Sequence, residues 1–519
     1  MQQEHSLKKR YFYKLFTNFL GLGVSLVTQT IVPRGLGPKS YGDFSFLSDY
    51  FNQFAGFFDM GTSIGFYTKL SQRPKEFKLV VFYFYFIGIA SLLLLTFVVV
   101  AHTTKMYTRL WPGQELFYIY LAVFWGILVW LINIMNRMTD AYGLTVSAEI
   151  GKVFQKTIGV FIIIILFVCH KLNLGSFFFY NYFTLFLLLI VFTYVMKRSG
   201  YSLLQSWKLT GEEIKNYIKE FYQYSHPLFI YSLVGLFAGI FDRWLLQVYG
   251  GSVQQGFFGL SYQIGAVCFL FSSAMTPLVT REFSIAYNNK DLVLMAKLFE
   301  KHIPLLYSIT AFLACFVAVN ADKVTHIIGG GKFKDAAWPV SIMAFYPIHQ
   351  TYGQLSGSVF YATGQTRLYR NIGVVFMLIG LPVTYFFVAH YDKFGINSGA
   401  TGLAIKMILL LIVTVNVQLY FNAKFLKLSF WRYFSHQIFC GGCLFITAFV
   451  ATFWVDKILG FHETVISSFI LTGFFYTLMV GFLVYHLPFV FGLKTQDIQS
   501  LIEMFTREIN KIGIIGKIK

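Results

Sequence analysis

The sequence predicts an all-α polytopic membrane protein with about 14 transmembrane helices: two six-helix bundles in a pseudo-two-fold arrangement, followed by two extra C-terminal helices. Three observations favour this fold class: the composition, the lengths of the apolar stretches and a weak internal repeat. The chain is 56% hydrophobic and only 13% charged, with a mean hydropathy of +0.61. Soluble domains carry about 25% charged residues, so this chain has too little charge to cover a soluble surface.

The apolar stretches are long enough to cross a bilayer, which takes about 20 residues in a helix. Helices are the expected spanning element because no lipid-exposed irregular backbone is tolerated at membrane depth. The second and tenth stretches are the most polar of the set. In chain order we expect spans at roughly 15–33, 44–66, 79–101, 116–136, 150–169, 177–196, 226–248, 257–279, 302–320, 338–361, 371–390, 399–421, 433–454 and 464–486.

Charge predicts the orientation of these spans. The chain has 42 lysines and arginines against 23 acidic residues, for a net charge of +19. With the N-terminus inside, most of the basic residues fall in the inner segments, and we place only Arg243 and Lys406 within spans. This bias follows the positive-inside rule and predicts cytoplasmic termini. The basic excess therefore reflects topology, and nucleic acid is not an expected partner.

Two short similarities indicate that the spans form two related halves. Gly42 and Gly256 begin similar segments at an offset of 214, and Ala141 and Ala362 begin a second pair at an offset of 221. Repeats of this kind are a recurring plan of transporters, with the substrate site at the repeat interface. We expect a cytoplasmic N-terminus, a first bundle with its inner linker, a second bundle, the last two spans and a basic amphipathic cytoplasmic tail, at 1–14, 15–220, 221–424, 425–490 and 491–519.

Span 2 carries the most polar face of any predicted span. Its polar residues fall within about 120° of one helix face, at 100° per residue. Ionised groups facing lipid are costly, so this face is expected to line a lumen. The stripe consists of Asp49, Asn52, Gln53, Gly56, Asp59 and Ser63.

Charged residues at the ends of spans 1 and 7 are further site candidates. Arg34 lies in the turn from Pro33 to Lys39, where proline and glycine predict a tight outer connection. It either solvates this turn or places a positive charge at a cavity mouth. Asp242 and Arg243 lie in the outer third of span 7. They either form an ion pair that holds helices together or supply a cavity charge in the second half.

Three polar residues of the later spans complete the candidates. Lys406 lies in span 12, too deep for its ammonium to reach the interface fully, so it needs a cavity, an acidic partner or a bound anion. His349 and Gln350 add polarity to span 10. His349 either titrates in a proton-coupled cycle or donates a hydrogen bond between helices.

Enzyme signatures are absent from the sequence. Gly329 to Lys332 lacks the spacing of a P-loop, and no HExxH, GxSxG or kinase motif occurs. No cofactor and no metal are expected, and neither is ATP hydrolysis. Transport would be driven by a proton or sodium gradient, or by the gradient of the substrate itself.

Several segments resemble one transporter family. They are "PRGLGPKSYGDFSF" after the first span, "DMGTSIGFYTKLSQ" at the end of the second, "HPLFIYSLVGLFAGIFDRWLL" with "GFFGLSYQIGAV" in the second half, and "YATGQTR" before span 11. This order of segments resembles the polysaccharide flippases, which translocate O-antigen, capsule and exopolysaccharide repeat units. These belong to the multidrug/oligosaccharidyl-lipid/polysaccharide exporter superfamily, in which multidrug exporters usually have 12 spans and lipid II flippases have 14.

The resemblance implies a protein of the bacterial cytoplasmic membrane that flips undecaprenyl-pyrophosphate-linked oligosaccharides from the inner to the outer leaflet by alternating access. Membrane lipids, polysaccharide polymerases and glycosyltransferases would be its other partners. Arg34, Arg243 and Lys406 would attract the diphosphate, because phosphate accepts strong charge-assisted hydrogen bonds. One alternative is an ion-coupled exporter of drugs or organic cations on the same scaffold. Another is a membrane polysaccharide polymerase or glycosyltransferase, which the short outer loops disfavour.

Overall fold

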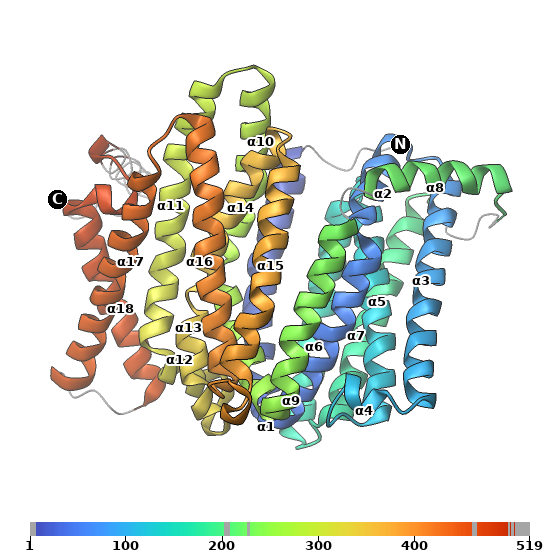
Figure 1. Ribbon diagram of the computed structural model, residues 1–519, viewed down its shortest axis with the longest axis horizontal. Helices are drawn as coiled ribbons and strands as arrows, with labels where there is room; N and C mark the ends of the chain where they lie inside the picture. Colours follow the sequence, from blue (N-terminus) through green and yellow to red (C-terminus); the bar gives the residue numbers. More distant parts are fainter. Residues whose placement is uncertain are drawn as a thin grey trace, which may run out of the picture. The chain divides into compact units, whose positions relative to one another are not determined.

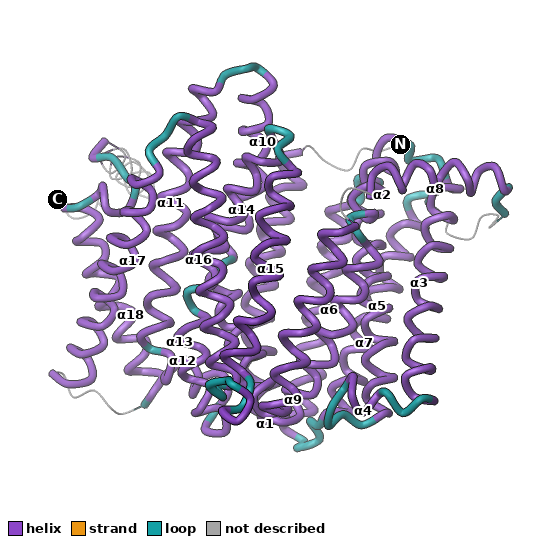
Figure 2. Tube along the Cα trace, viewed as in Figure 1, coloured by secondary structure: helices purple, strands orange, loops and turns teal. Residues whose placement is uncertain are grey.

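The structure is a computed structural model that describes residues 7–201, 208–225, 229–458, 464–496, 499 and 503. Every regular element within this part of the chain is helical, and no strand occurs in it (Figure 2). Ten of the described helices are long and apolar enough to cross a membrane. The predicted fold class is therefore confirmed, and the chain is an integral multi-pass membrane protein.

The chain forms two compact units, which we call unit 1 and unit 2. Unit 1 comprises 1–259, 328–333 and 377–403, and unit 2 comprises 260–327, 334–376 and 404–519. Unit 1 holds α1 (Leu7–Asp59), α2 (Thr62–Gln72), α3 (Phe77–Thr103), α4 (Tyr107–Leu110), α5 (Leu116–Ala141), α6 (Thr145–Val168), α7 (Leu174–Arg198), α8 (Gly211–Ser225), most of α9 (Phe229–Cys268) and the 3₁₀ turn η3 (Tyr391–Lys393).

Unit 2 contains the later helices, several of which begin or end in unit 1. They are α10 (Leu270–Asn288), α11 (Leu292–Val319), α12 (Ala321–Gly329), η2 (Gly331–Ala336), α13 (Ala337–Met343), α14 (Tyr346–Ala362), α15 (Thr366–Val388), α16 (Gly399–Leu426), α17 (Phe430–Phe453), the π-helical turn η4 (Trp454–Ile458), α18 (Val465–His486) and η5 (Pro488–Phe491).

The first predicted turn is tighter than the sequence suggested. The chain stays helical through Pro33 to Lys39 except at Gly37, whose φ of 72° and ψ of 172° break α1 in two. Glycine tolerates this positive φ because it has no Cβ. Pro38 follows at the first position of the new helical segment, where its missing N–H costs nothing. Spans 1 and 2 are therefore one helix in sequence with a one-residue corner.

The internal repeat is visible in the backbone. Gly251 breaks α9 with φ 67° and ψ −173°, nearly the angles of Gly37. The two breaks are 251 − 37 = 214 residues apart, the offset already seen between Gly42 and Gly256. The second offset, 221, likewise relates Gly143 (φ 76°) to Gly364 (φ 72°), each in the turn after a long helix.

Three predicted spans are interrupted. Span 2 leaves the helical conformation at Met60 and Gly61, which have φ values of 40° and 76°, and resumes as α2. Span 8 is divided between α9 and α10, and span 10 between α13 and α14. Such interruptions inside membrane-depth segments occur in transporters where backbone faces protein or a cavity.

Helix α8 lies in the linker between the predicted spans 6 and 7. Within unit 1 it crosses the bundle at one end, while α4 lies at the opposite end (Figure 1). We call these the α8 end and the α4 end. Glu220 pairs with Lys69 and Arg73, and Glu213 with Lys78 at 2.5 Å, while Tyr217 is buried against the bundle.

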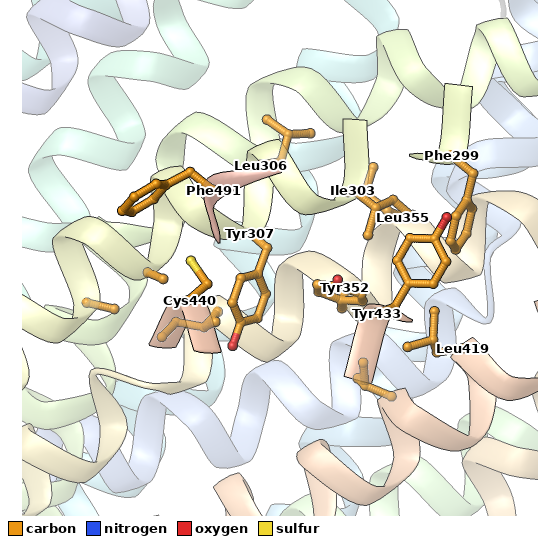
Figure 3. Close-up of a cluster of buried hydrophobic side chains, with 14 of the residues drawn as sticks. Phe299, Ile303, Leu306, Tyr307, Tyr352, Leu355, Leu419, Tyr433, Cys440 and Phe491 are labelled. Carbon is orange, nitrogen blue, oxygen red and sulfur yellow. The ribbon is translucent and has the colours of Figure 1, made fainter. Parts of the chain in front are cut away.

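Unit 2 has an aromatic core between α11, α14 and α17. In Figure 3, Tyr307 lies between Cys440 and Tyr352, and its ring meets that of Tyr352 edge-on at 5.0 Å. Tyr307 also donates a 3.0 Å hydrogen bond to the carbonyl of Gln437. This bond satisfies the hydroxyl inside the core. The predicted basic tail falls mostly at 497–498, 500–502 and 504–519, outside the described residues.

Candidate functional site

Arg243 joins α9 to the polar stripe of α1 in unit 1. Its Nε donates to Oδ2 of Asp49 at 3.1 Å, and its two terminal nitrogens donate to Oε1 of Gln255 at 2.9 Å and to Oγ of Ser45 at 3.0 Å. The guanidinium also lies 4.7 Å from the ring centre of Phe258. Of the two alternatives that the sequence left open, the geometry of Arg243 matches the ion pair between helices.

The next turn of the stripe also meets α9. A Cβ placed on Gly239 would lie 2.8 Å from Cδ of Gln53, so this glycine makes room for the glutamine side chain. Asn52, by contrast, is exposed. The stripe of span 2 is thus divided between residues that bind α9 and residues that remain accessible.

Asp59 ends α1 and forms a small polar cluster inside unit 1. Its Oδ2 accepts a 2.8 Å hydrogen bond from Ser63, and its Oδ1 accepts longer bonds of 3.4 Å from Tyr83 and from Trp130. All three donors are neutral. The carboxylate therefore lies at a helix break, held by neutral groups from α2, α3 and α5.

Asp242 lies beside Arg243 in sequence but contacts a different helix. Its Oδ1 accepts a 2.6 Å hydrogen bond from Thr384 of α15. The adjacent residues Asp242 and Arg243 therefore connect α9 to α15 and α1 respectively. The structure brings Asp49 and Arg243 into contact, but it does not pair Arg243 with Asp242.

Arg34 is exposed near the corner of α1. Its Cγ would lie 3.7 Å from a Cβ on Gly330, in the turn between α12 and η2 that belongs to unit 1. Close to this corner, Gln114 Nε2 donates to Asp43 at 2.7 Å, and Gln247 Nε2 donates to the Pro112 carbonyl at 2.9 Å. At the α4 end of unit 1, these bonds connect the segment between α4 and α5 to α1 through Asp43 and to α9 through Gln247.

The remaining candidates belong to unit 2. Lys406 is only 7% exposed on α16. His349 and Gln350 are half-buried on α14, and the His349 ring lies 6.4 Å from that of Tyr307, with no hydrogen bond to its Nδ1 from any described residue. Nearby, Thr276 donates to Gln354 at 3.2 Å. The described part of the chain contains no cluster of metal-ligating residues.

Helix α6 carries a cluster of three charged residues that was not predicted from the sequence. Glu149, Lys152 and Lys156 lie on α6, and Lys152 pairs with Glu149 at 2.7 Å. The prediction that Arg243 and Lys406 alone among the basic residues lie within spans is therefore wrong. Both α6 lysines fall inside the predicted span 150–169, so their position in that range was the signal that was available.

Comparisons with known proteins agree with this fold. No protein-family model and no curated protein sequence matches the chain. Among solved structures it is similar to the lipid II flippase MurJ in an inward closed conformation, with a TM-score of 0.64, 13% identity, and coverage of 92% of this chain and 99% of that chain.

Two further solved structures are similar. An inward-facing multidrug resistance MATE family transporter of the MOP superfamily matches with a TM-score of 0.60 and 16% identity, covering 78% of this chain and 94% of that chain. A MOP superfamily transporter from Pyrococcus furiosus Vc1, described as having a binding pocket of reverse polarity, matches with a TM-score of 0.53 and 16% identity, covering 82% and 98%.

The long apolar helices define the class: an all-helical, multi-pass membrane protein. More specifically, the fold is similar to that of the solved MATE family transporter and of MurJ. At 13–16% identity these likenesses establish the fold and leave the substrate to be argued from this chain.

Proposed function

We propose that this protein is a flippase that moves lipid-linked oligosaccharides across the bacterial cytoplasmic membrane by alternating access. The observation that carries the proposal is the extent of the fold match. The match to the lipid flippase covers 92% of this chain, against 78% for the inward-facing multidrug transporter. A 14-helix lipid flippase accounts for α17 and α18, which a 12-helix exporter does not require.

The charges within the helices are compatible with a diphosphate-linked substrate. Lys406 is nearly fully buried in unit 2, and Lys152 and Lys156 lie on one helix of unit 1. A diphosphate and its sugars cannot cross hydrocarbon unaided, whereas a polyprenyl tail can remain in lipid. Basic groups at membrane depth would lower the cost of moving the head group, because phosphate accepts charge-assisted hydrogen bonds from lysine and arginine.

An exporter of organic cations is a second candidate that one observation favours. Asp59 is a carboxylate inside unit 1 that receives hydrogen bonds only from neutral donors among the described residues. Such a group can pair with a cationic drug or carry a coupling proton. On either proposal the driving ion, H⁺ or Na⁺, would bind at a group of this kind.

The deciding experiment is deletion of the gene, followed by extraction of polyprenyl-linked oligosaccharides and a leaflet-accessibility test. Accumulation on the inner face with loss of surface glycan is the expected result, reversed by the wild-type gene. Lys406→Ala should fail to restore export, whereas Lys406→Arg should restore most of it. Normal surface glycan with a changed sensitivity to cationic drugs would reject the flippase and support the exporter.

A further inference from the structure

The chain between α15 and α16 forms a short loop of unit 1 that is fixed by its own backbone. The N–H groups of Ile396, Asn397 and Ser398 donate back to carbonyl oxygens at the end of α15, each at 2.9 Å. A Cβ on Gly395 would lie 2.0 Å from the carbonyl oxygen of Ala389, so the loop lies directly against the end of that helix. The loop is therefore a rigid support for the side chains that it carries.

Phe394 occupies an unfavourable position in this loop. It follows η3 with φ 59° and ψ 22°, the left-handed conformation that a bulky residue rarely adopts. The residue is 93% exposed, so packing inside the protein does not compensate for this conformation. Tyr391, at the start of η3, is 74% exposed. The loop thus presents two aromatic side chains that pack little against unit 1, which is typical of a contact surface.

Polar groups surround these two rings. His390, Asp392, Lys393 and Asn397 are all exposed. The His390 ring meets that of Tyr249 in α9 edge-on at 5.1 Å, and Nζ of Lys393 lies 5.6 Å from the centre of the same tyrosine ring. Tyr249 therefore supports the base of the loop, while a carboxylate and an amide stay exposed beside Tyr391 and Phe394.

This mixture of groups distinguishes between partners. The interface of a lipid bilayer accepts aromatic rings, but here it would also have to cover the charges of Asp392 and Lys393, which are costly to take out of water. A sugar suits both kinds of group. The C–H face of its ring packs against an aromatic ring, and its hydroxyls exchange hydrogen bonds with carboxylate and amide groups.

The loop lies at the α4 end of unit 1. Tyr249, which contacts the loop, comes two residues after Gln247, and Gln247 binds the Pro112 carbonyl in the segment after α4. In the orientation that the basic residues predict, this end is the outer one. A head group moved across the membrane would leave the protein on this side.

We propose that Tyr391 and Phe394 bind the glycan of the translocated molecule at the outer face of the protein. The inference rests on the proposed function, which supplies an oligosaccharide as substrate. The two rings would stack on sugar C–H faces, while Asp392 accepts hydrogen bonds from sugar hydroxyls and Asn397 exchanges them. Because the loop is rigid, binding would not first have to order a flexible segment.

The test is saturation-transfer difference NMR on the purified full-length protein in nanodiscs of zwitterionic lipid. The probe is the oligosaccharide that mild acid releases from the polyprenyl diphosphates of the same cells. Wild type should transfer saturation to the ring protons of this probe, and Phe394→Ala should weaken its binding about fivefold, as expected for one aromatic contact. Phe394→Trp should stay within about twofold of wild type. Phe179→Ala is the matched control, because Phe179 is 79% exposed on α7.

A second variant separates glycan binding from a structural role of the ring. Asparagine adopts the left-handed conformation more readily than phenylalanine. Phe394→Asn should therefore unfold at the wild-type temperature or slightly above it, and should still lose glycan binding as Phe394→Ala does. A clear fall in Tm for Phe394→Asn would show that the ring packs into the protein, which would overturn the proposal.

The remaining outcomes separate this inference from the proposed function. Wild-type binding that Phe394→Ala leaves unchanged, or no binding although the deletion strain accumulates inner-face oligosaccharide, would overturn the site and keep the flippase. Normal surface glycan with changed drug sensitivity would overturn both.

Two other occupants of the loop are also tested. If brominated lipid, and not acrylamide, quenches the fluorescence that Phe394→Trp adds, the ring lies in the bilayer. If wild type is a dimer in nanodiscs and Phe394→Ala is a monomer, the surface binds a second copy of the chain. Either result would overturn the glycan assignment.

Discussion

Gly42 offers the sharpest test of the packing in unit 1. A Cβ at this position would lie 1.7 Å from the carbonyl oxygen of Ser252 and 2.7 Å from the amide nitrogen of Gly256. Both neighbours are backbone atoms, which cannot rotate away as a side chain can. Gly42→Ala must therefore push α1 and α9 apart until this distance grows from 1.7 Å to the 3.4 Å at which ordinary van der Waals contact begins.

The cost of this separation can be estimated. Overpacking a well-packed interior costs typically 1–3 kcal/mol, and a clash with backbone belongs at about 3 kcal/mol. Unit 1 has nearly 300 residues, somewhat more than the domains in which each kcal/mol shifts Tm by roughly 2–4 °C, so Gly42→Ala should lower Tm by about 6 °C. The hydrogen bond from Gln114 to Asp43 should weaken as the helices separate, since both residues lie at this junction.

The assay is thermal unfolding of the purified protein in nanodiscs, followed by tryptophan fluorescence. Gly23→Ala is the matched control because Gly23 lies on the same helix and its Cβ would meet nothing within 4 Å. Alanine has a higher helix propensity than glycine, so this control should be neutral or slightly stabilising. Equal Tm values for the two variants would refute the proposed contact between α1 and α9.

Two further predictions concern ion pairs of unit 1. Arg243→Leu should cost about 2 kcal/mol, less than the roughly 3–5 kcal/mol of a fully buried pair, because the Asp49 side chain is 37% exposed; adding Asp49→Asn should recover part of the lost Tm, and no recovery would contradict the pairing. Lys78 and the backbone N–H of Thr210 hold the pKa of Glu213 below its ordinary value, so the stabilisation by Glu213 is complete above the ordinary carboxyl pKa of about 4.3 and is lost as the pH falls through the lowered one. A spin label at Lys215 should therefore become more mobile in acid, whereas Lys78→Ala should weaken this pH dependence.

Sequence patterns were sufficient for the architecture because each relied on a strong local constraint. Span length and the glycine-proline corner at Gly37 are set by the bilayer and by backbone sterics, which act the same way in any fold. The same offset of 214 relates Gly37 to Gly251, where the structure has a second corner that was not predicted from the sequence. These features did not require knowledge of tertiary contacts.

The contacts of the candidate site residues could be predicted less well from the sequence than the spans could. Whether Arg243 faces Asp49 or Asp242 depends on helix rotation, which neighbouring residues alone do not determine. The break at Met60 was missed because a methionine with φ 40° is held by its surroundings and not by its own preference. Lys156 was missed because it was counted with the inner segments although it lies inside the predicted span 150–169.

The contact between α1 and α9 at Gly42 and Gly256, which follow the corners at Gly37 and Gly251, constrains how this chain could have diverged after a duplication. In unit 1 each glycine lies against backbone of the other repeat: Gly42 against Ser252, and Gly256 against Pro38, whose carbonyl oxygen would be 2.1 Å from an added Cβ. A larger residue in one repeat cannot be accommodated by shrinking the other, since glycine is already the smallest. Both copies are therefore held to the ancestral residue at this point, while the faces around them, such as α6 with its lysines, are free to acquire different chemistry in each half.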